Sequence, residues 1–277
     1  MRFGISTHLY HDATLSREHL ATIAAHEFEA IELFATRTHV DYHDAHTVAQ
    51  LGGWLRETGL TLHSVHAPIA SGFAGGAWGQ PYSNAAEDPA ERRRAVDEAL
   101  AALAVARVIP YRFLVLHLGV PRGVPGAPVD RADAARRSVE DLIETAAPLG
   151  VTLALEVIPN ALSTPDALVR LIEEDVEPGA AGICLDYGHA HMLGDVVDAI
   201  ETVSGHQVTT HIHDNGGRSD EHLPPFEGNI DWASALIATQ KVGYDGTFML
   251  EVAGAGAPDQ VLARTRHSRT RLGELLA

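Results

Sequence analysis

The sequence alternates short apolar runs with longer amphipathic segments, and this alternation restricts its fold more than any other feature. Eight such pairs follow one another along 277 residues. Short runs rich in Val, Ile and Leu are typical of buried parallel strands, and the segments between them have helical spacing. The expected strands are Arg2–Ser6, Ala30–Phe34, Leu60–Val65, Phe113–His117, Thr152–Glu156, Ala181–Leu185, Val208–His211 and Thr247–Glu251. The expected helices are Arg17–His26, Ala45–Thr58, Pro89–Arg107, Arg131–Ala147, Pro165–Glu173, Asp195–Thr202, Trp232–Lys241 and Pro258–Leu275.

Eight consecutive strand–helix units predict an α/β protein with a single domain, a (β/α)8 TIM barrel over residues 1–277. The competing architecture is an open doubly wound sheet. It needs a glycine-rich phosphate loop after the first strand, and residues 5–8 contain no glycine. Helices are expected to start at capping side chains and to end at glycines. The expected caps are Ser16, Asp88, Asp130, Thr164 and Asp231, and the expected end glycines are Gly150, Gly205 and Gly243.

Two segments are long for barrel loops. Residues 67–86 are rich in glycine and aromatic side chains, and residues 119–129 contain three prolines. Both follow expected strands, at the end of a barrel where active sites form. They are therefore candidates for lids or substrate walls, and a mobile surface loop is an equal alternative.

The chain is strongly acidic, with 20 Lys and Arg against 37 Asp and Glu and a net charge of −17. Proteins that bind nucleic acids neutralise phosphates with Lys and Arg, so this balance argues against a nucleic-acid partner. The basic stretches at residues 91–94 and 264–271 are expected to be solvated helix faces.

Cys184 is the sole cysteine, which excludes an intramolecular disulfide and favours a reducing, cytoplasmic location. The first residues lead directly into a strand and do not form a signal peptide. No apolar stretch approaches the roughly 20 residues that span a bilayer. We therefore expect neither export nor membrane insertion, and the oligomeric state has no sequence signature.

Ionisable side chains stand at the ends of six consecutive expected strands. These ends meet at one mouth of a parallel barrel. Burying such groups unpaired would cost on the order of several kcal/mol each, and a bound cation removes this cost. Imidazoles and carboxylates without thiolates suit Zn, Mn or a similar divalent ion. The six residues are His66, His117, Glu156, Asp186, His211 and Glu251.

Several other ionisable residues have weaker patterns. Glu32 lies in the second expected strand and is either a ligand or a partner of one. Strand alternation points His63 away from the face of His66, so His63 is expected to be structural. The remaining early histidines are expected to be solvated or structural, and they are His8, His11, His26, His39, His43 and His46.

Two histidines and a carboxylate follow close behind the seventh expected strand. His213 shares parity with His211, so periodicity alone leaves open which of the two is the ligand. Asp220 and His222 are two residues apart, and in an extended segment that spacing lets both reach one ion from the same side.

Five short stretches carry information about the family, and they are Val65–Pro68, Leu153–Glu156, Cys184–His189, His211–Asn215 and Gly228–Trp232. Together they resemble the xylose isomerase-like TIM-barrel superfamily. This superfamily includes sugar and sugar-phosphate isomerases and epimerases, and the endonuclease IV type of apurinic-site endonuclease (AP endonuclease family 2). The resemblance extends over nearly the whole chain and is specific to the superfamily, not to one reaction.

In the isomerase and epimerase branch, the resemblance implies one divalent ion held by side chains of the last four strands. These ligands fall on Glu156, Asp186, His211 and Glu251. His211 is preferred to His213, because Asp214 stands three residues after it at the family's spacing.

The resemblance also implies an activity. Glu156 and Glu251 would exchange a proton with carbon on a small carbohydrate or phosphorylated substrate, while the metal polarises a carbonyl and the adjacent hydroxyl. His189 resembles the family's substrate-contacting histidine. Arg218 follows His211 by seven residues and is a candidate for binding a phosphate or hydroxyl.

The endonuclease branch implies a cluster of up to three zinc ions with additional ligands. These fall on His66, His117, His189, Asp220 and His222. Because every one of these positions is filled, a metal-dependent phosphoester hydrolase is the alternative function, on a small substrate in preference to DNA. The isomerase-like class comes first, since superfamily members with similar His-Asp-Asn and Asp-x-His regions are grouped with sugar isomerases. A structural metal cluster or a sugar-binding module is the third interpretation.

Overall fold

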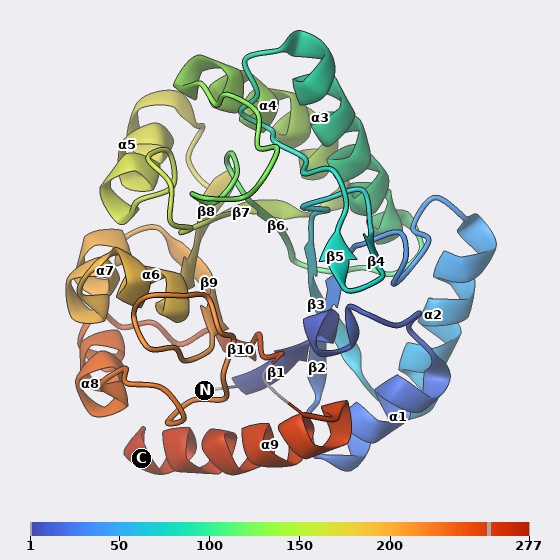
Figure 1. The fold of residues 1–277 in the computed structure, drawn as a ribbon, viewed down its shortest axis with the longest axis vertical. Helices are drawn as coiled ribbons and strands as arrows, with labels where there is room; N and C mark the ends of the chain where they lie inside the picture. The colour runs from blue at the N-terminus through green and yellow to red at the C-terminus, as the bar shows by residue number, and fades with distance from the viewer. Residues whose placement is uncertain (1, 254–255, 277) are drawn as a thin grey trace.

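The computed structural model describes residues 2–253 and 256–276. Eight parallel strands close into a barrel in the order β1-β10-β9-β8-β7-β6-β3-β2, and helices surround it (Figure 1). The predicted (β/α)8 barrel is thereby confirmed. The barrel strands are β1 (Arg2–Ser6), β2 (Ala30–Phe34), β3 (Thr61–His66), β6 (Phe113–Leu116), β7 (Thr152–Glu156), β8 (Ala181–Asp186), β9 (Gln207–Ile212) and β10 (Thr247–Leu250).

The helices agree with the expected segments to within a few residues. The α-helices are α1 (Arg17–Ala25), α2 (Ala45–Thr58), α3 (Pro89–Leu103), α4 (Ala132–Ala146), α5 (Pro165–Asp175), α6 (Tyr187–Leu193), α7 (Val196–Val203), α8 (Trp232–Lys241) and α9 (Pro258–Leu275). Single 3-10 turns are η1 (Thr7–Tyr10), η2 (Ala104–Arg107) and η3 (Ala147–Leu149). The short α6 was not expected. It begins directly after β8, where Asp186 accepts a hydrogen bond from the backbone N–H of His189.

Alternate residues of β7 pack in two different layers. Leu153 and Leu155 of β7 belong to the core between the barrel and its helices. Ala154 packs inside the barrel with Phe113 and Val115 of β6. Because side chains alternate along a strand, the interior face of β7 ends at Glu156, whose side chain lies at the mouth of the barrel.

The predicted helix boundaries hold with one clear exception. Four of the expected caps accept backbone hydrogen bonds, and they are Ser16, Asp88, Thr164 and Asp231. Asp130 does not cap a helix, because Arg131 is the N-cap of α4 and makes no side-chain cap bond. Of the expected end glycines, Gly150 and Gly243 have positive φ, whereas Gly205 follows the end of α7 without it.

Asp130 instead ties the two long loops to each other. Its carboxylate accepts hydrogen bonds from Ser83 Oγ in the first loop and, at 3.0 Å, from the backbone N–H of Val120 in the second. The first loop also contains a small hairpin that the sequence did not reveal, β4 (Phe73–Ala74) and β5 (Ala77–Trp78). The two loops, which follow β3 and β6, are therefore joined to each other at the mouth of the barrel.

Strand alternation fails at His63. The pairing of β2 with β3 shifts between Ile31 and Glu32, which inserts an extra residue into β3. His63 Nε2 lies 3.2 Å from Thr209 Oγ1 on β9, and these two strands are not neighbours in the barrel. The expectation that His63 faces away from the side of His66 is therefore wrong, because the bulge turns both residues toward the interior.

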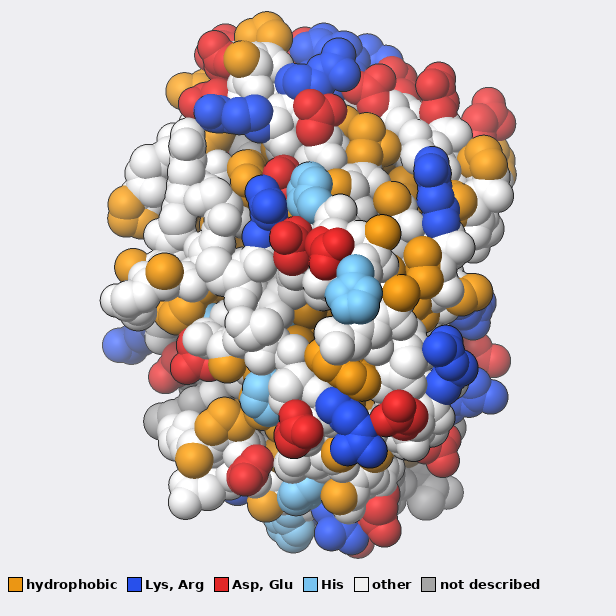
Figure 2. Space-filling view, turned by 90° about the vertical axis from the view of Figure 1, so that its right-hand side faces the viewer, with side chains coloured by type: hydrophobic (Ala, Val, Ile, Leu, Met, Phe, Trp, Pro, Cys, Tyr) orange, Lys and Arg blue, Asp and Glu red, His pale blue; other side chains and the backbone are white. Residues whose placement is uncertain are grey.

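Arginines in both basic stretches form ion pairs with acidic side chains. Arg92 Nη1 lies 2.9 Å from Asp141, and Arg264 Nε lies 2.9 Å from Glu227. On the face drawn in Figure 2, basic and acidic side chains are interspersed among apolar ones. Among the described residues, no helix combines the length and the hydropathy that crossing a lipid bilayer requires.

We expect His63 to make stability depend on pH. Burial lowers the pKa of His63 from 6.5 to about 4. As the pH falls through this range, the unfolded chain takes up a proton that the folded protein does not bind, so the free energy of unfolding decreases. The free energy of unfolding, measured by urea titration, should fall between pH 7 and pH 5 in the unchanged protein. In His63→Gln this fall should be smaller by on the order of 1–2 kcal/mol.

The matched control is His267→Gln on the exposed surface of α9. It should reproduce the pH dependence of the unchanged protein. If His63→Gln also reproduces it, the buried imidazole is not the source.

Candidate metal centre

Four ligand-type side chains from four successive strands meet inside the mouth of the barrel. They come from the ends of β7 and β8, from β9 and from the residue after β10. All four are buried, and one ligand atom of each lies within 4.8 Å of the others. We call this set the central group, and it consists of Glu156, Asp186, His211 and Glu251.

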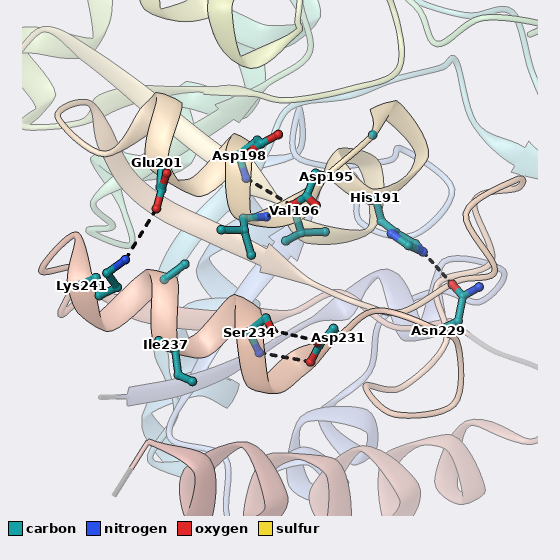
Figure 3. A pocket seen from close by; sticks show the side chains of 13 residues that line it. His191, Asp195, Val196, Asp198, Glu201, Asn229, Asp231, Ser234, Ile237 and Lys241 are labelled. Carbon is teal, nitrogen blue, oxygen red and sulfur yellow. Dashed lines mark hydrogen bonds and ion pairs between the residues drawn. The ribbon is translucent and has the colours of Figure 1, made fainter.

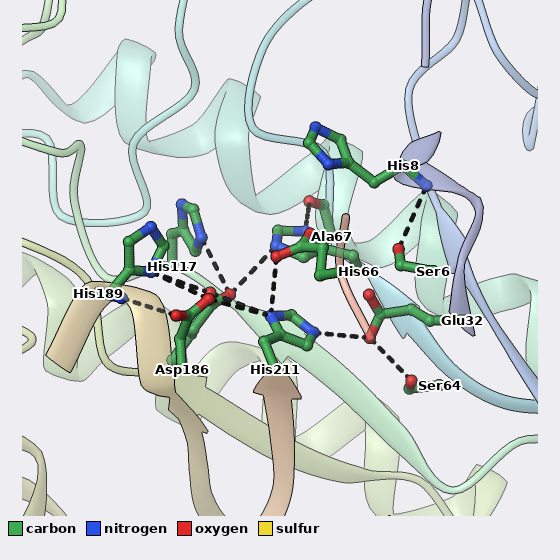
Figure 4. Close-up of polar contacts among 12 residues, drawn as sticks. Ser6, His8, Glu32, Ser64, His66, Ala67, His117, Asp186, His189 and His211 are labelled. Carbon is green, nitrogen blue, oxygen red and sulfur yellow. Dashed lines mark hydrogen bonds and ion pairs between the residues drawn. The ribbon is translucent and has the colours of Figure 1, made fainter. Parts of the chain in front are cut away.

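His211 lies at the middle of the central group. Its Nδ1 lies 3.1 Å from Glu156 Oε1 and 3.2 Å from Glu251 Oε2. Its Nε2 lies 3.0 Å from Glu32, which also accepts a hydrogen bond of 2.8 Å from Ser64 Oγ (Figure 4). Glu32 belongs to none of the ligand groups found among the described residues. Its geometry is that of a partner that orients the ring.

A second set of donors shares Glu156 with the central group. His66 Nε2 and His117 Nε2 lie 3.2 and 3.0 Å from Glu156 Oε2. We call His66, His117 and Glu156 the His117 group, and its ligand atoms also lie within 4.8 Å of one another. Burial by itself raises the pKa of Glu156, but the nearby His211 and His117 hold it well below its usual value. The lowered pKa favours the ionised carboxylate, which faces the imidazoles of His66, His117 and His211 and, at 3.4 Å, that of His189.

A third set lies at the outer side of the mouth. Asp220 Oδ2 lies 3.1 Å from His189 Nε2 and 3.0 Å from His222 Nε2. Burial lowers the pKa of His222, but Asp220 outweighs this effect and raises it to about 10. With His213 these residues form what we call the loop group, whose four ligand atoms again lie within 4.8 Å of one another.

The loop that carries Asp220 and His222 is held by a buried carboxylate. Asp214 is fully buried and accepts hydrogen bonds from the backbone N–H groups of Phe226 and Ile230, at 2.9 and 3.2 Å. It also accepts one of 2.8 Å from Trp232 Nε1. Buried donors without a partner cost free energy, so this arrangement fixes the path of residues 214–232.

All nine ligand positions expected from the sequence gather at this mouth. Among the described residues they form four overlapping or adjoining groups, the three above and a fourth made of His66, His211 and Glu251. Sequence reasoning left His213 open, and the structure brings its Nε2 within 3.1 Å of Asp186. The sequence signal for His213 was its position two residues after His211, which places both side chains on the same side of an extended strand. His8, expected to be solvated or structural, is buried at the mouth with its ring 4.7 Å from that of His222, and it belongs to no ligand group among the described residues. Arg218 belongs to none of these groups; it is exposed and lines a cleft that His117 and Asp220 also line.

The donor set fits a divalent cation. Each group combines imidazole nitrogens with carboxylate oxygens, and none of those found among the described residues contains the thiol of Cys184. Such mixed donors suit Zn or Mn. The buried carboxylates face imidazoles at hydrogen-bonding distance, and a bound cation would balance the same charges.

A second cavity contains polar side chains that cap the neighbouring helices or pair with each other. A cavity of about 580 Å³ lies outside the barrel beside α7 and α8 (Figure 3). Asp195 caps α7, Asp231 caps α8, and Glu201 pairs with Lys241 at 4.0 Å. These groups are satisfied as caps and a surface pair, and the mouth of the barrel is the better candidate site.

We expect Gly188 to be required by the ring of His213. A Cβ at Gly188 would lie 2.0 Å from His213 Cε1. Gly188→Ala should therefore displace the ring and lower the free energy of unfolding by about 1–3 kcal/mol, measured by urea titration. Gly205→Ala is the control, since its Cβ would meet nothing within 4 Å. Equal stability of the two variants would contradict the packing described here.

Comparison with known proteins supports a family assignment. The chain is 27% identical over 259 residues to the uncharacterized protein MJ1311 of Methanocaldococcus jannaschii, a match that covers 91% of this chain and 83% of that protein. A crystal structure of a D-tagatose 3-epimerase-like protein superposes with a TM-score of 0.80 at 25% identity, covering 100% of this chain and 98% of that one.

Other sugar epimerases share the architecture. The structure of an L-ribulose 3-epimerase has a TM-score of 0.78 at 20% identity, covering 99% of this chain and 94% of that one, a likeness that shows the fold alone. The model of the family described as xylose isomerase-like TIM barrel matches residues 20–271. The chain therefore belongs to the xylose isomerase-like TIM-barrel family.

Proposed function

We propose that this protein is a divalent-metal-dependent isomerase or epimerase that acts on a small polyhydroxy substrate. One observation carries the proposal, namely the gathering of four buried ligand atoms, one from each of four successive strands, within 4.8 Å at the mouth of the barrel. The similarity to a D-tagatose 3-epimerase-like protein supports the same class of reaction. The metal would be Zn or Mn, held by the central group.

A bound cation would supply Lewis-acid polarisation of the substrate's carbonyl and adjacent hydroxyl. The chain's own groups would move the proton. Glu156 and Glu251 lie on either side of His211 Nδ1, at 3.1 and 3.2 Å. One carboxylate would remove a proton from carbon while the other returns one, which requires both within hydrogen-bond reach of the reacting atom.

Residues around the two glutamates would keep them in position. His66 and His117 hold Glu156 Oε2, so that Oε1 stays directed toward His211. His189 lies between the central group and Asp220, with Nδ1 3.4 Å from Glu156 Oε1. It is the proposed substrate-contacting histidine. Arg218, at the rim, would bind a phosphate or hydroxyl of the substrate.

A second candidate function is hydrolysis of a phosphoester on a small substrate. The specific observation in its favour is that the His117 group and the loop group adjoin the central group. Sites with two or three metal ions stabilise both the attacking and the leaving oxygen of a phosphoryl transfer. An isomerase with one ion needs only the central group. The net charge of −17 disfavours DNA as the substrate.

The metal content separates these two functions. Protein purified without chelator should contain about one divalent ion per chain if it is an isomerase, and about two or three if it is a hydrolase. Elemental analysis gives the count, and removal of the metal should lower the melting temperature, because a ligand that binds only the folded state stabilises it. Protein without any divalent ion, and unaffected by added Zn or Mn, would overturn both functions.

Glu251→Gln should remove turnover while leaving the barrel folded. The amide cannot exchange a proton with carbon, so we expect a loss of at least about 100-fold. The assay is conversion of D-tagatose, D-allulose, L-ribulose or one of their phosphate esters, whichever the unchanged protein converts, with circular dichroism as the check on folding. Glu201→Gln on the exposed surface of α7 is the matched control. Turnover by Glu251→Gln equal to that of the control would exclude Glu251 from the mechanism.

Asp220→Ala tests the loop group. The substitution removes the carboxylate that faces His189 and His222, so a protein with several ions should lose about one of them. A protein with one ion should keep its ion. Ser219→Ala, the neighbouring exposed residue, should change neither the ion count nor turnover. Retention of every ion in Asp220→Ala would contradict the multi-metal hydrolase.

A further inference from the structure

A cleft opens beside the candidate metal centre. It encloses about 490 Å³ and is lined by the two long loops and the loop after β9, with Pro159 after β7 and Met192 of α6. His117 of the His117 group and Asp220 of the loop group both form part of its wall. A molecule that occupies the cleft would therefore adjoin the donors described above.

The wall of this cleft is mostly hydrocarbon. Trp78 and Val124 in it are 39% and 36% exposed, which leaves apolar surface open at the mouth. Each hydroxyl of a polyol needs hydrogen-bond partners, and a wall of this composition offers few of them. The apolar lining side chains include Ile69, Trp78, Pro81, Val124, Pro159 and Met192.

Two guanidinium groups stand in this apolar wall. Arg122 comes from the second long loop and Arg218 from the loop after β9. Neither makes an ion pair with another residue in the part of the chain that the structure describes, whereas Arg92 and Arg264 on the outer helices are paired. In a chain with a net charge of −17, two unpaired guanidiniums in one cleft are suited to an oxyanion.

We infer that the substrate combines an oxyanion, either a phosphate or a carboxylate, with an apolar and preferably aromatic body. The body would pack against Trp78 and Met192 while Arg122 and Arg218 bind the oxyanion. This inference rests on the proposed function and extends its substrate: the polyhydroxy part would react at the central group, and the adjoining cleft would hold the oxyanion and the apolar body attached to it. It separates this protein from an enzyme for free, uncharged sugars, and it adds Arg122 as a residue that determines specificity.

Binding can be followed through Trp78. The other two tryptophans are more buried, with Trp232 2% exposed, so a ligand in the cleft should change chiefly the fluorescence of Trp78. The probes are phenyl phosphate, phenylacetate, D-ribose 5-phosphate and benzyl alcohol. Trp78→Phe should abolish the signal, which locates the probe. The metal content of every sample is measured in parallel.

We expect phenyl phosphate or phenylacetate to bind at least about tenfold more tightly than both D-ribose 5-phosphate and benzyl alcohol. The tighter of the two aromatic anions identifies the oxyanion. Arg122→Ala and Arg218→Ala should each weaken its binding about tenfold without changing the metal content. Arg107→Ala is the control, since Arg107 is exposed and precedes β6 at the opposite end of the barrel.

Two results would overturn the inference. One is D-ribose 5-phosphate binding as tightly as the aromatic anions. The other is unchanged affinity in both arginine variants relative to Arg107→Ala. Absence of metal would overturn the proposed function, and the ratios of probe affinities would still decide the substrate class.

Discussion

The site depends on the balance of buried charge around Glu156. This carboxylate is fully buried at the end of β7 and lies within 3.4 Å of four imidazoles, those of His66, His117, His189 and His211. A carboxylate in this position is tolerated only if positive charge faces it, since desolvation would otherwise neutralise it. Burial lowers the pKa of His189 and of His211, but the surrounding carboxylates outweigh it and raise both well above the usual value, which favours positive charge beside Glu156. A divalent cation would supply that charge more compactly. The same requirement brings donors from separate strands to one place.

Two further carboxylates hold the loops around this centre. Asp214 binds the loop that carries Asp220 and His222, and Asp130 connects the two long loops that wall the cleft. Neither belongs to a ligand group among the described residues. Their role is to satisfy backbone donors that an irregular loop would otherwise leave unpaired. Metal-type donors and the apolar cleft are thus parts of one continuous surface, with His117 and Asp220 common to both.

A barrel fold hosts many reactions, so the likeness to sugar epimerases describes the scaffold, and the reaction depends on the mouth. There the described residues offer four overlapping or adjoining donor groups and an apolar cleft with two guanidiniums. A single catalytic ion would leave the His117 group and the loop group as polar partners of that ion. Several ions would make them ligands. The substrate class inferred from the cleft is compatible with one ion or with several. With one ion the oxyanion would only be bound, and with several it could be the group that reacts.

The barrel and most of the donor positions could be predicted from the sequence. Strand–helix alternation sets the fold, and parallel topology brings strand ends such as Glu156 and Asp186 to the same mouth. The side of the sheet that His63 faces could be known only from the tertiary structure, because a β-bulge overrides strand alternation. The same holds for the role of Asp130, because an Asp that caps a helix and an Asp that joins two loops look alike in sequence. The tertiary structure also decided that His213 joins His189, Asp220 and His222, and that Arg122 and Arg218 share one cleft. Such contacts join loops far apart in the chain, and local periodicity carries no information about them.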